Sequence, residues 1–283
     1  MKKLRLAAVW PGSRIEGLRT LSPSEVSEFH AANRELATFV QERELYAIFA
    51  MNVETLLEFL RTAASEMSTA RQTATFDGLR PNANRHVMNI LTSMRTYLDH
   101  TETTLSHRHG RGSKPLNDFR TLCSRHYDRT FSYRFLYKLR NYAQHCGMPV
   151  GDVRSRLVSG GTECLVVSYN RDDLIRDYTK WGDPVKQELP RQPRLINIVR
   201  HLGPLARCLT NIERWVARLD AQRVRAHARF LVGLANEVRA SRADSDPALL
   251  SGTKHRDGSV NLLITSFPPD SVLSQCAGTR GAR

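Results

Sequence analysis

The segment FSYRFLYKLRNYAQHCG, residues 131–147, decides the interpretation of this sequence because it divides an apolar face from a polar one. Side chains advance by about 100° per residue on a helix, so spacing assigns each residue to a face. One narrow arc holds Phe131, Phe135, Leu139, Tyr142 and Cys146. The other side holds Tyr133, Tyr137, Arg140, Asn141 and Gln144, with His145 at its margin. We therefore predict a helix with a core face and a polar aromatic face.

Helical patterns extend outward in both directions from this segment. Ser22-Pro23-Ser24-Glu25 is a helix start signal, with a hydroxyl cap, a proline in the first turn and a glutamate three residues after the cap. A second helix is indicated by the stripe Val87, Leu91, Met94, Leu98 and Leu105. A third is predicted from about Pro115 to Cys146, before Gly147 and Pro149. A last long helix is indicated by Val199, Leu202, Leu209, Ile212, Val216 and Leu219.

The middle and the end of the chain lack this long helical pattern. Two apolar runs, Val153–Val158 and Glu163–Tyr169, flank Ser159-Gly160-Gly161-Thr162 and predict a β-hairpin. Asn170 is placed to cap a short helix that follows the hairpin. Residues 241–283 are rich in Ser, Gly, Asp and Pro, so we expect a loosely ordered tail.

The predicted fold class is mainly α, an antiparallel helical bundle with a small β-hairpin insertion. The expected segments are an N-terminal extension (1–22), a helical bundle that carries residues 131–147 (23–150), an insertion of the hairpin and a short helix (151–192), a C-terminal bundle helix (193–240) and a loosely ordered tail (241–283).

The chain is strongly basic, and its charge is unevenly distributed. It has 42 Lys and Arg against 28 Asp and Glu, a formal charge of +14 over 283 residues. Residues 81–150 alone hold 11 basic and 4 acidic side chains. A concentrated basic segment attracts polyanions such as RNA or DNA. An alternative stays open, because only 7 of the 42 basic residues are Lys, and an arginine bias of this kind can reflect coding composition.

Several classes of protein lack support in the sequence. No run approaches about 18 apolar residues, and the stretch Leu6–Trp10 is too short for an export signal, so we expect a cytoplasmic protein with no membrane partner. The five cysteines are scattered without a C-x-x-C pair, and there is no H-E-x-x-H, no P-loop and no G-x-G-x-x-G. We therefore expect no metal site and no cofactor.

The polar face carries Arg140-Asn141-x-x-x-His145 late in its helix, and this pattern resembles the motif of HEPN-domain ribonucleases. In that family four to six residues separate an arginine from a histidine, and a polar residue commonly follows the arginine. The resemblance implies metal-independent RNA cleavage at a composite site between two protomers, so RNA and a second copy of the chain are the expected partners. It also implies a toxin or a phage-defence effector, with an antitoxin or a regulatory protein as a further partner.

Carried over by position, the resemblance implies that Arg140 binds and stabilises the scissile phosphate and that His145 takes part in proton transfer at the attacking 2′-hydroxyl. It implies that Asn141 orients or supports these two side chains. Arginine offers fixed donors to phosphate oxygens, and histidine titrates near neutrality. RNA binding is assigned to five neighbours on the same helix, since paired aromatic rings can stack on bases. These neighbours are Tyr133, Arg134, Tyr137, Lys138 and Gln144. An ordinary interface or surface is the alternative for them.

The motif spacing alone is not specific, because five Arg/His pairs have it. They are Arg80/His86, Arg95/His100, Arg120/His126, Arg140/His145 and Arg194/His201. In Arg140/His145 alone an asparagine follows the arginine, and its helix has a strong apolar face. Arg95/His100 is the nearest competitor.

The alternative function is a non-catalytic helical scaffold or sensor that binds a protein partner or nucleic acid through the basic face.

Overall fold

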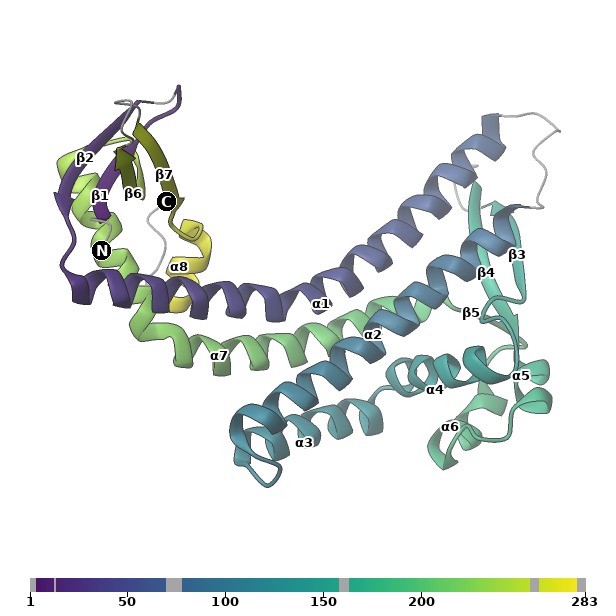
Figure 1. Ribbon diagram of the computed structural model, residues 1–283. Helices are drawn as coiled ribbons and strands as arrows, with labels where there is room; N and C mark the ends of the chain where they lie inside the picture. The colour runs from purple at the N-terminus through teal and green to yellow at the C-terminus, as the bar shows by residue number, and fades with distance from the viewer. Residues whose placement is uncertain (1–3, 13, 70–77, 158–162, 255–259, 279–283) are drawn as a thin grey trace. The chain divides into compact units, whose positions relative to one another are not determined.

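The computed structural model describes residues 4–12, 14–69, 78–157, 163–254 and 260–278. The described chain is mainly α-helical, as predicted, and forms two compact units. The first unit comprises residues 1–43 and 217–283, and the second comprises residues 44–216. The two longest helices, α1 (Pro23–Thr69) and α7 (Val199–Ser241), each contribute to both units (Figure 1). In this described part of the chain, no helix combines the length and the apolarity needed to span a bilayer.

The first unit is built on a four-stranded antiparallel sheet (Figure 1). Its strands are β1 (Leu4–Val9), β2 (Ile15–Thr20), β6 (Asp246–Lys254) and β7 (Val260–Ser266), in the order β2-β1-β6-β7. A short helix, α8 (Asp270–Ala277), follows β7. Leu6, Phe29, Leu231, Leu249 and Leu273 are buried in one cluster that joins the sheet to α1, α7 and α8. The two ends of the chain therefore share one core.

The loosely ordered tail predicted for 241–283 is wrong for the residues that the structure describes. The apolar island Leu262–Phe267 supplies most of β7, and β6 pairs with β1 in a continuous register. The extension predicted for 1–22 is likewise a hairpin of β1 and β2, with Gly12 at φ +87° in its turn. The sequence did not predict this sheet because its central strands, β1 and β6, come from opposite ends of the chain. Pairing partners so far apart leave no local pattern.

The second unit combines three packed helices with a smaller sheet. The helices are α2 (Leu79–His109), α3 (Lys114–Arg129) and α4 (Phe131–His145), and each packs against the other two. The strands are β3 (Asp152–Leu157), β4 (Glu163–Asn170) and β5 (Leu195–Asn197), antiparallel in the order β3-β4-β5. Between β4 and β5 lie α5 (Arg171–Asp177), α6 (Asp183–Glu188) and the 3₁₀ turn η2 (Leu189–Arg191).

Several local predictions are confirmed. At the start of α1, the Ser22 N–H donates to the Glu25 carboxylate at 2.7 Å, and the Glu25 N–H donates to the Ser22 hydroxyl at 3.3 Å. Asn170 caps α5 by accepting from the N–H of Asp172 at 3.0 Å. The predicted hairpin strands pair as β3 and β4, although their turn falls within 158–162, outside the described residues. The sequence missed β5, which adds a third strand.

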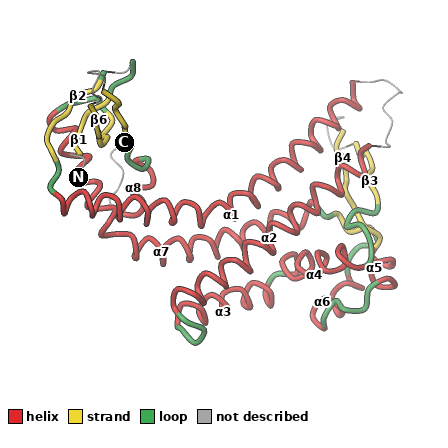
Figure 2. Tube along the Cα trace, viewed as in Figure 1, coloured by secondary structure: helices red, strands yellow, loops and turns green. Residues whose placement is uncertain are grey.

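The predicted third helix is two helices, α3 and α4, with a short loop between them (Figure 2). Thr130 separates them with an extended backbone, φ −127° and ψ 104°, and its N–H donates to the carbonyl of His126 at 3.0 Å. The Arg134 guanidinium then donates to the carbonyls of Tyr127 and Asp128 at 2.8 and 3.1 Å. These bonds satisfy the last carbonyls of α3. Because an arginine side chain supplies the cap, no Gly or Pro marks this break in the sequence.

Candidate functional site

The apolar face of α4 fixes the helix in the second unit. Phe135, Leu139 and Tyr142 are buried, as predicted. Phe135 and Tyr142 both stack on Trp181, each with 6.1 Å between ring centroids. Cys146, at the end of the predicted arc, is instead exposed. The packing of these rings sets the rotation of α4, and the rotation decides which polar side chains reach solvent.

The motif side chains lie in the last turns of α4. Arg140 and Asn141 are half-buried, while His145, the final residue of the helix, is exposed. Arg140 Nη1 donates to Oε1 of Gln144, and Arg140 Nε is buried with no hydrogen-bond partner among the described residues. None of the described hydrogen bonds or ion pairs joins Arg140 to His145. Five residues correspond to about 140° between side-chain directions on an ideal helix, so the two groups leave α4 in different directions.

The chain turns sharply directly after His145. Gly147 allows the chain to pass close to Tyr142 here, because a Cβ there would lie 2.7 Å from the hydroxyl oxygen of Tyr142. That hydroxyl is hydrogen-bonded to the hydroxyl of Tyr169 on β4. Burial, followed by this bond to Tyr169, raises the pKa of Tyr142, so the phenol stays protonated at neutral pH. The end of α4 is thereby tied to the smaller sheet.

Asn84 of α2 holds the segment that follows this turn. Its Oδ1 accepts from the N–H of Val150 at 2.9 Å, and its Nδ2 donates to the carbonyl of Val150 at 3.1 Å. Both bonds are buried, so they satisfy two backbone groups that water does not reach. Sequence reasoning missed Asn84. The one available signal was its place on the apolar stripe of α2, three residues before Val87.

The five Arg/His pairs with motif spacing have different surroundings. Burial lowers the pKa of His86, His126 and His201. His201 is also hydrogen-bonded through Nδ1 to the Ser132 hydroxyl at 2.8 Å. These three imidazoles are held within the fold, whereas the histidines of the other two pairs are exposed. Two of the five pairs therefore present a histidine to solvent, the competitor Arg95/His100 and the motif itself.

The arginines separate these two pairs. Arg95 forms an ion pair with Asp99 at 2.7 Å and lies over the ring of Tyr137, 4.8 Å from its centroid. Arg140 makes no ion pair with any carboxylate of the described residues. Within the described chain, Arg140/His145 is thus the one pair that combines an exposed imidazole with a guanidinium not bound to a carboxylate.

The assignment of RNA binding to Tyr133 and Arg134 is wrong. Tyr133 is 2% exposed, and burial raises its pKa. Arg134 is 5% exposed and, besides capping α3, forms an ion pair with Glu188. The physical reason is the packing of the first turn of α4 against the end of α3, because the ring of Tyr133 contacts His126 and Arg134 donates to the last carbonyls of α3.

Tyr137, Lys138 and Gln144 remain nearer to the surface of α4. Tyr137 is half-buried, and its ring contacts Arg95 as well as the ring of Tyr127 at 6.1 Å. Lys138 is half-buried, and Gln144 is exposed but bonded to Arg140. The predicted pair of stacking tyrosines is therefore an internal contact, and RNA binding by the three remaining residues stays a prediction.

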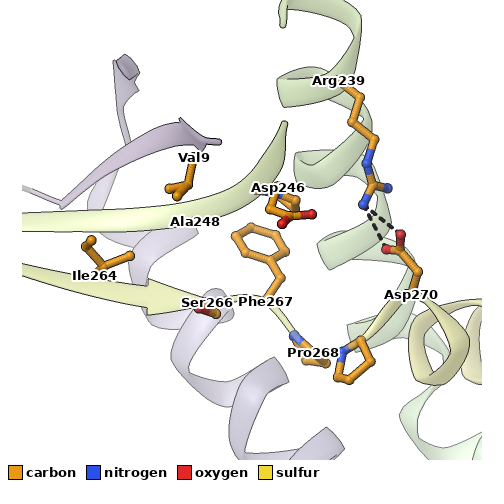
Figure 3. Close-up of a pocket in the computed structure, with 11 residues that line it drawn as sticks. Val9, Arg239, Asp246, Ala248, Ile264, Ser266, Phe267, Pro268 and Asp270 are labelled. Atoms are coloured by element: carbon orange, nitrogen blue, oxygen red, sulfur yellow. Dashed lines mark hydrogen bonds and ion pairs between the residues drawn. The ribbon is translucent and has the colours of Figure 1, made fainter. Parts of the chain in front are cut away.

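A cavity of about 290 Å³ in the first unit lies where β7 leads into α8 (Figure 3). Val9 and Phe267 form part of its apolar wall, and Asp246 adds a carboxylate. Arg239 donates to both carboxylate oxygens of Asp270, at 2.9 and 2.8 Å, as the dashed lines in Figure 3 mark. Because this guanidinium is neutralised and a second carboxylate is present, the cavity is poorly suited to a phosphate.

No family model matches this chain, and no curated protein or solved structure matches it. Among the described residues, no three His, Cys, Asp or Glu side chains gather as a metal site would require. The function must therefore be inferred from the geometry of the chain itself and from the motif resemblance.

Proposed function

We propose that this protein is a metal-independent endoribonuclease of the HEPN type that acts through Arg140 and His145. The observation that carries the proposal is the comparison of the five Arg/His pairs, in which this pair joins an exposed imidazole to an arginine not bound to a described carboxylate. The mutual packing of α2, α3 and α4 supports a small helical bundle around the motif helix, which the proposal needs.

The chemistry follows from the two side chains. The His145 imidazole takes the proton of a ribose 2′-hydroxyl, and the 2′-oxygen attacks the adjacent phosphorus while the bond to the 5′-oxygen breaks. Arg140 stabilises the extra negative charge on the phosphoryl oxygens in the transition state, and Asn141 orients the Arg140 side chain. A second imidazole, in its charged form, gives a proton to the leaving 5′-oxygen. The products are a 2′,3′-cyclic phosphate and a 5′-hydroxyl.

The second imidazole comes, in this proposal, from a second copy of the chain. Arg140 and His145 point about 140° apart on one helix, so a phosphate between two copies of α4 can reach an arginine of one and a histidine of the other. The cleavage rate per protomer should therefore fall when the protein is diluted below the dissociation constant of the dimer. A role as a toxin or phage-defence effector, held by an antitoxin or a regulatory protein, belongs to the proposal through the resemblance.

The test is an RNA cleavage assay with purified protein and excess EDTA. We expect cleavage to persist in EDTA, His145→Ala to lower the rate by about 10²–10⁴-fold, and Arg140→Ala to lower it by at least about 10²-fold. The matched control is His100→Ala, which removes an exposed histidine with the same spacing from an arginine and should leave the rate unchanged. Thermal unfolding of each variant checks that the fold is intact.

Undiminished cleavage by folded His145→Ala or Arg140→Ala protein would reject this function. RNA binding without any cleavage, weakened by added salt, would identify the non-catalytic scaffold or sensor instead. An equal loss of cleavage with His100→Ala would show that any exposed histidine has the same effect on the rate, and the motif would then have no special role.

A further inference from the structure

A cavity of about 600 Å³ opens beside the end of α4, within the second unit. It is bounded by the first turns of α2, by the segment from Met148 to Gly151, and by Tyr169 of β4. Met148 follows His145 by three residues, and Tyr169 is hydrogen-bonded to Tyr142 of α4. The volume lies within the range of about 300–1,000 Å³ that is typical of small-ligand sites. The cavity is thus adjacent to the motif helix both along the chain and through a hydrogen bond.

Two exposed arginines of α2, Arg80 and Arg85, line this cavity. Arg85 has neutral neighbours, the side-chain oxygen of Asn82 at 3.5 Å and Nε2 of His86 at 3.2 Å. The side chain of Arg80 makes no hydrogen bond or ion pair with another described residue, although its backbone carbonyl accepts from Nδ2 of Asn84 at 3.1 Å. No acidic side chain is among the described residues of the lining. Two positive charges therefore border the cavity without a local carboxylate, and such a site favours an anion.

The rest of the wall is apolar and aromatic. Met88 and Met148 line it together with the ring of Tyr169, and Met148 is 62% exposed although it is a large apolar side chain. A flat base can lie against thioether and aromatic groups without a specific hydrogen-bond pattern. Asn84, which is also part of the lining, fixes Val150 and so gives the wall a defined shape.

We propose that this cavity binds one unpaired nucleotide of the RNA strand, next to the bond that Arg140 and His145 cleave. Its base lies against Met148 and Tyr169, and its phosphate binds Arg80 and Arg85. The proposal rests on the proposed nuclease function, because it names the form of the substrate at that same site. A base held in a duplex cannot enter such a cavity, so the preferred substrate is single-stranded RNA.

The test measures fluorescence anisotropy of a labelled single-stranded oligoribonucleotide of mixed sequence, in the His145→Ala background so that the strand is not cut. We expect the double variant Arg80→Ala/Arg85→Ala to weaken Kd by roughly ten- to a hundredfold. Each phosphate contact on a single strand contributes about −0.7 to the slope of log K against log salt, so loss of this one contact should make the slope less steep by about 0.7. A duplex of the same sequence should bind more weakly and should be affected less.

The matched control is Arg111→Ala/Arg200→Ala, which removes two exposed arginines that do not line the cavity and changes the net charge equally. This pair should change Kd less than the cavity pair. Equal weakening by the two pairs, or no weakening by the cavity pair, would overturn the proposal. Met148→Asp adds a second test, since it should weaken binding by placing a carboxylate against the base and the phosphate.

These results are separable from the nuclease assay. If His145→Ala abolishes cleavage while the cavity pair binds RNA normally, the cavity proposal alone is rejected. If the wild-type chain cleaves no RNA, the proposed function is rejected, and loss of binding in the cavity pair then assigns the cavity to RNA recognition without catalysis.

Discussion

The cavities of the two units differ in how their arginines are paired. In the first unit, Arg239 is bound through both oxygens of Asp270 (Figure 3). In the second unit, Arg80 and Arg85 border a cavity whose described lining contains no carboxylate. A guanidinium that already holds a carboxylate has its charge locally neutralised, whereas one without a carboxylate is available to a phosphate.

The same use of arginine recurs through the first unit. Arg19 donates to the carboxylates of both Glu25 and Glu237, at 2.7 and 2.6 Å, and Arg43 forms an ion pair with Asp220. These pairs join α1 to β2 and to α7. A net charge of +14 therefore does not by itself locate a site for a polyanion. The distribution of carboxylates around the arginines does.

The largest expected effect tests whether the paired arginines are structural. Asp220 is 3% exposed, so Arg43→Ala leaves a buried carboxylate without this guanidinium and should lower the free energy of unfolding by about 3–5 kcal/mol. Arg80→Ala, at an exposed position of the second unit, should change it by less than about 0.5 kcal/mol. Urea denaturation of the two variants measures both values. Similar losses would break the contrast between the carboxylate-bound arginine and the cavity arginine.

A second prediction concerns the second unit, where the neutral side chain of Asn84 fixes the wall of the cavity. Asn84→Ala removes both hydrogen bonds to Val150 and leaves two buried backbone groups unsatisfied, so it should cost about 2–4 kcal/mol. RNA cleavage should fall as well, because the segment that follows His145 loses its anchor. Asn82→Ala, two residues before the anchor on the same helix, is the control and should cost less than about 1 kcal/mol. A small loss for Asn84→Ala would show that the segment is held by other contacts.

Local signals in the sequence predicted local structure well. The capping box at Ser22 and Glu25, the cap at Asn170 and the strands around 159–162 all depend on residues within a few positions of one another. The buried stripe of α2 followed from the same kind of spacing. For the site, periodicity correctly placed Tyr142 in the core and left His145 exposed.

Long-range contacts explain what the sequence could not predict. The sheet of the first unit joins the two ends of the chain, and the break at Thr130 depends on an arginine that reaches back to α3. The burial of Arg134 comes from this cap and from its ion pair with Glu188, both of which are tertiary contacts. The sequence pattern does not report these contacts, so Arg134 was wrongly assigned to RNA binding. The cavity beside α4 combines α2 with β4, which are far apart in the sequence. No local pattern reports such a juxtaposition.

The smallest effect expected concerns pH, and it tests the first unit's Arg19, which is bound to the carboxylates of Glu25 and Glu237. The hydrogen bond from Arg19, followed by the bonds from Ser22, lowers the pKa of Glu25 from its ordinary 4.5 to about 2. The ionised form is the one stabilised, so the stabilisation is complete above about pH 4.5 and is lost as the pH falls toward about 2. Glu25→Gln should therefore lower the free energy of unfolding by about 1 kcal/mol at pH 7, and this gap from the wild type should narrow steadily in urea denaturations between pH 5 and pH 3.

The control is Glu28→Gln, at an exposed position of the same helix, whose free energy of unfolding should match that of the wild type throughout. A gap for Glu25→Gln that does not change with pH would mean that the charge of Glu25 does not stabilise the first unit, and the contrast in arginine pairing would then rest on Arg43 and Arg239.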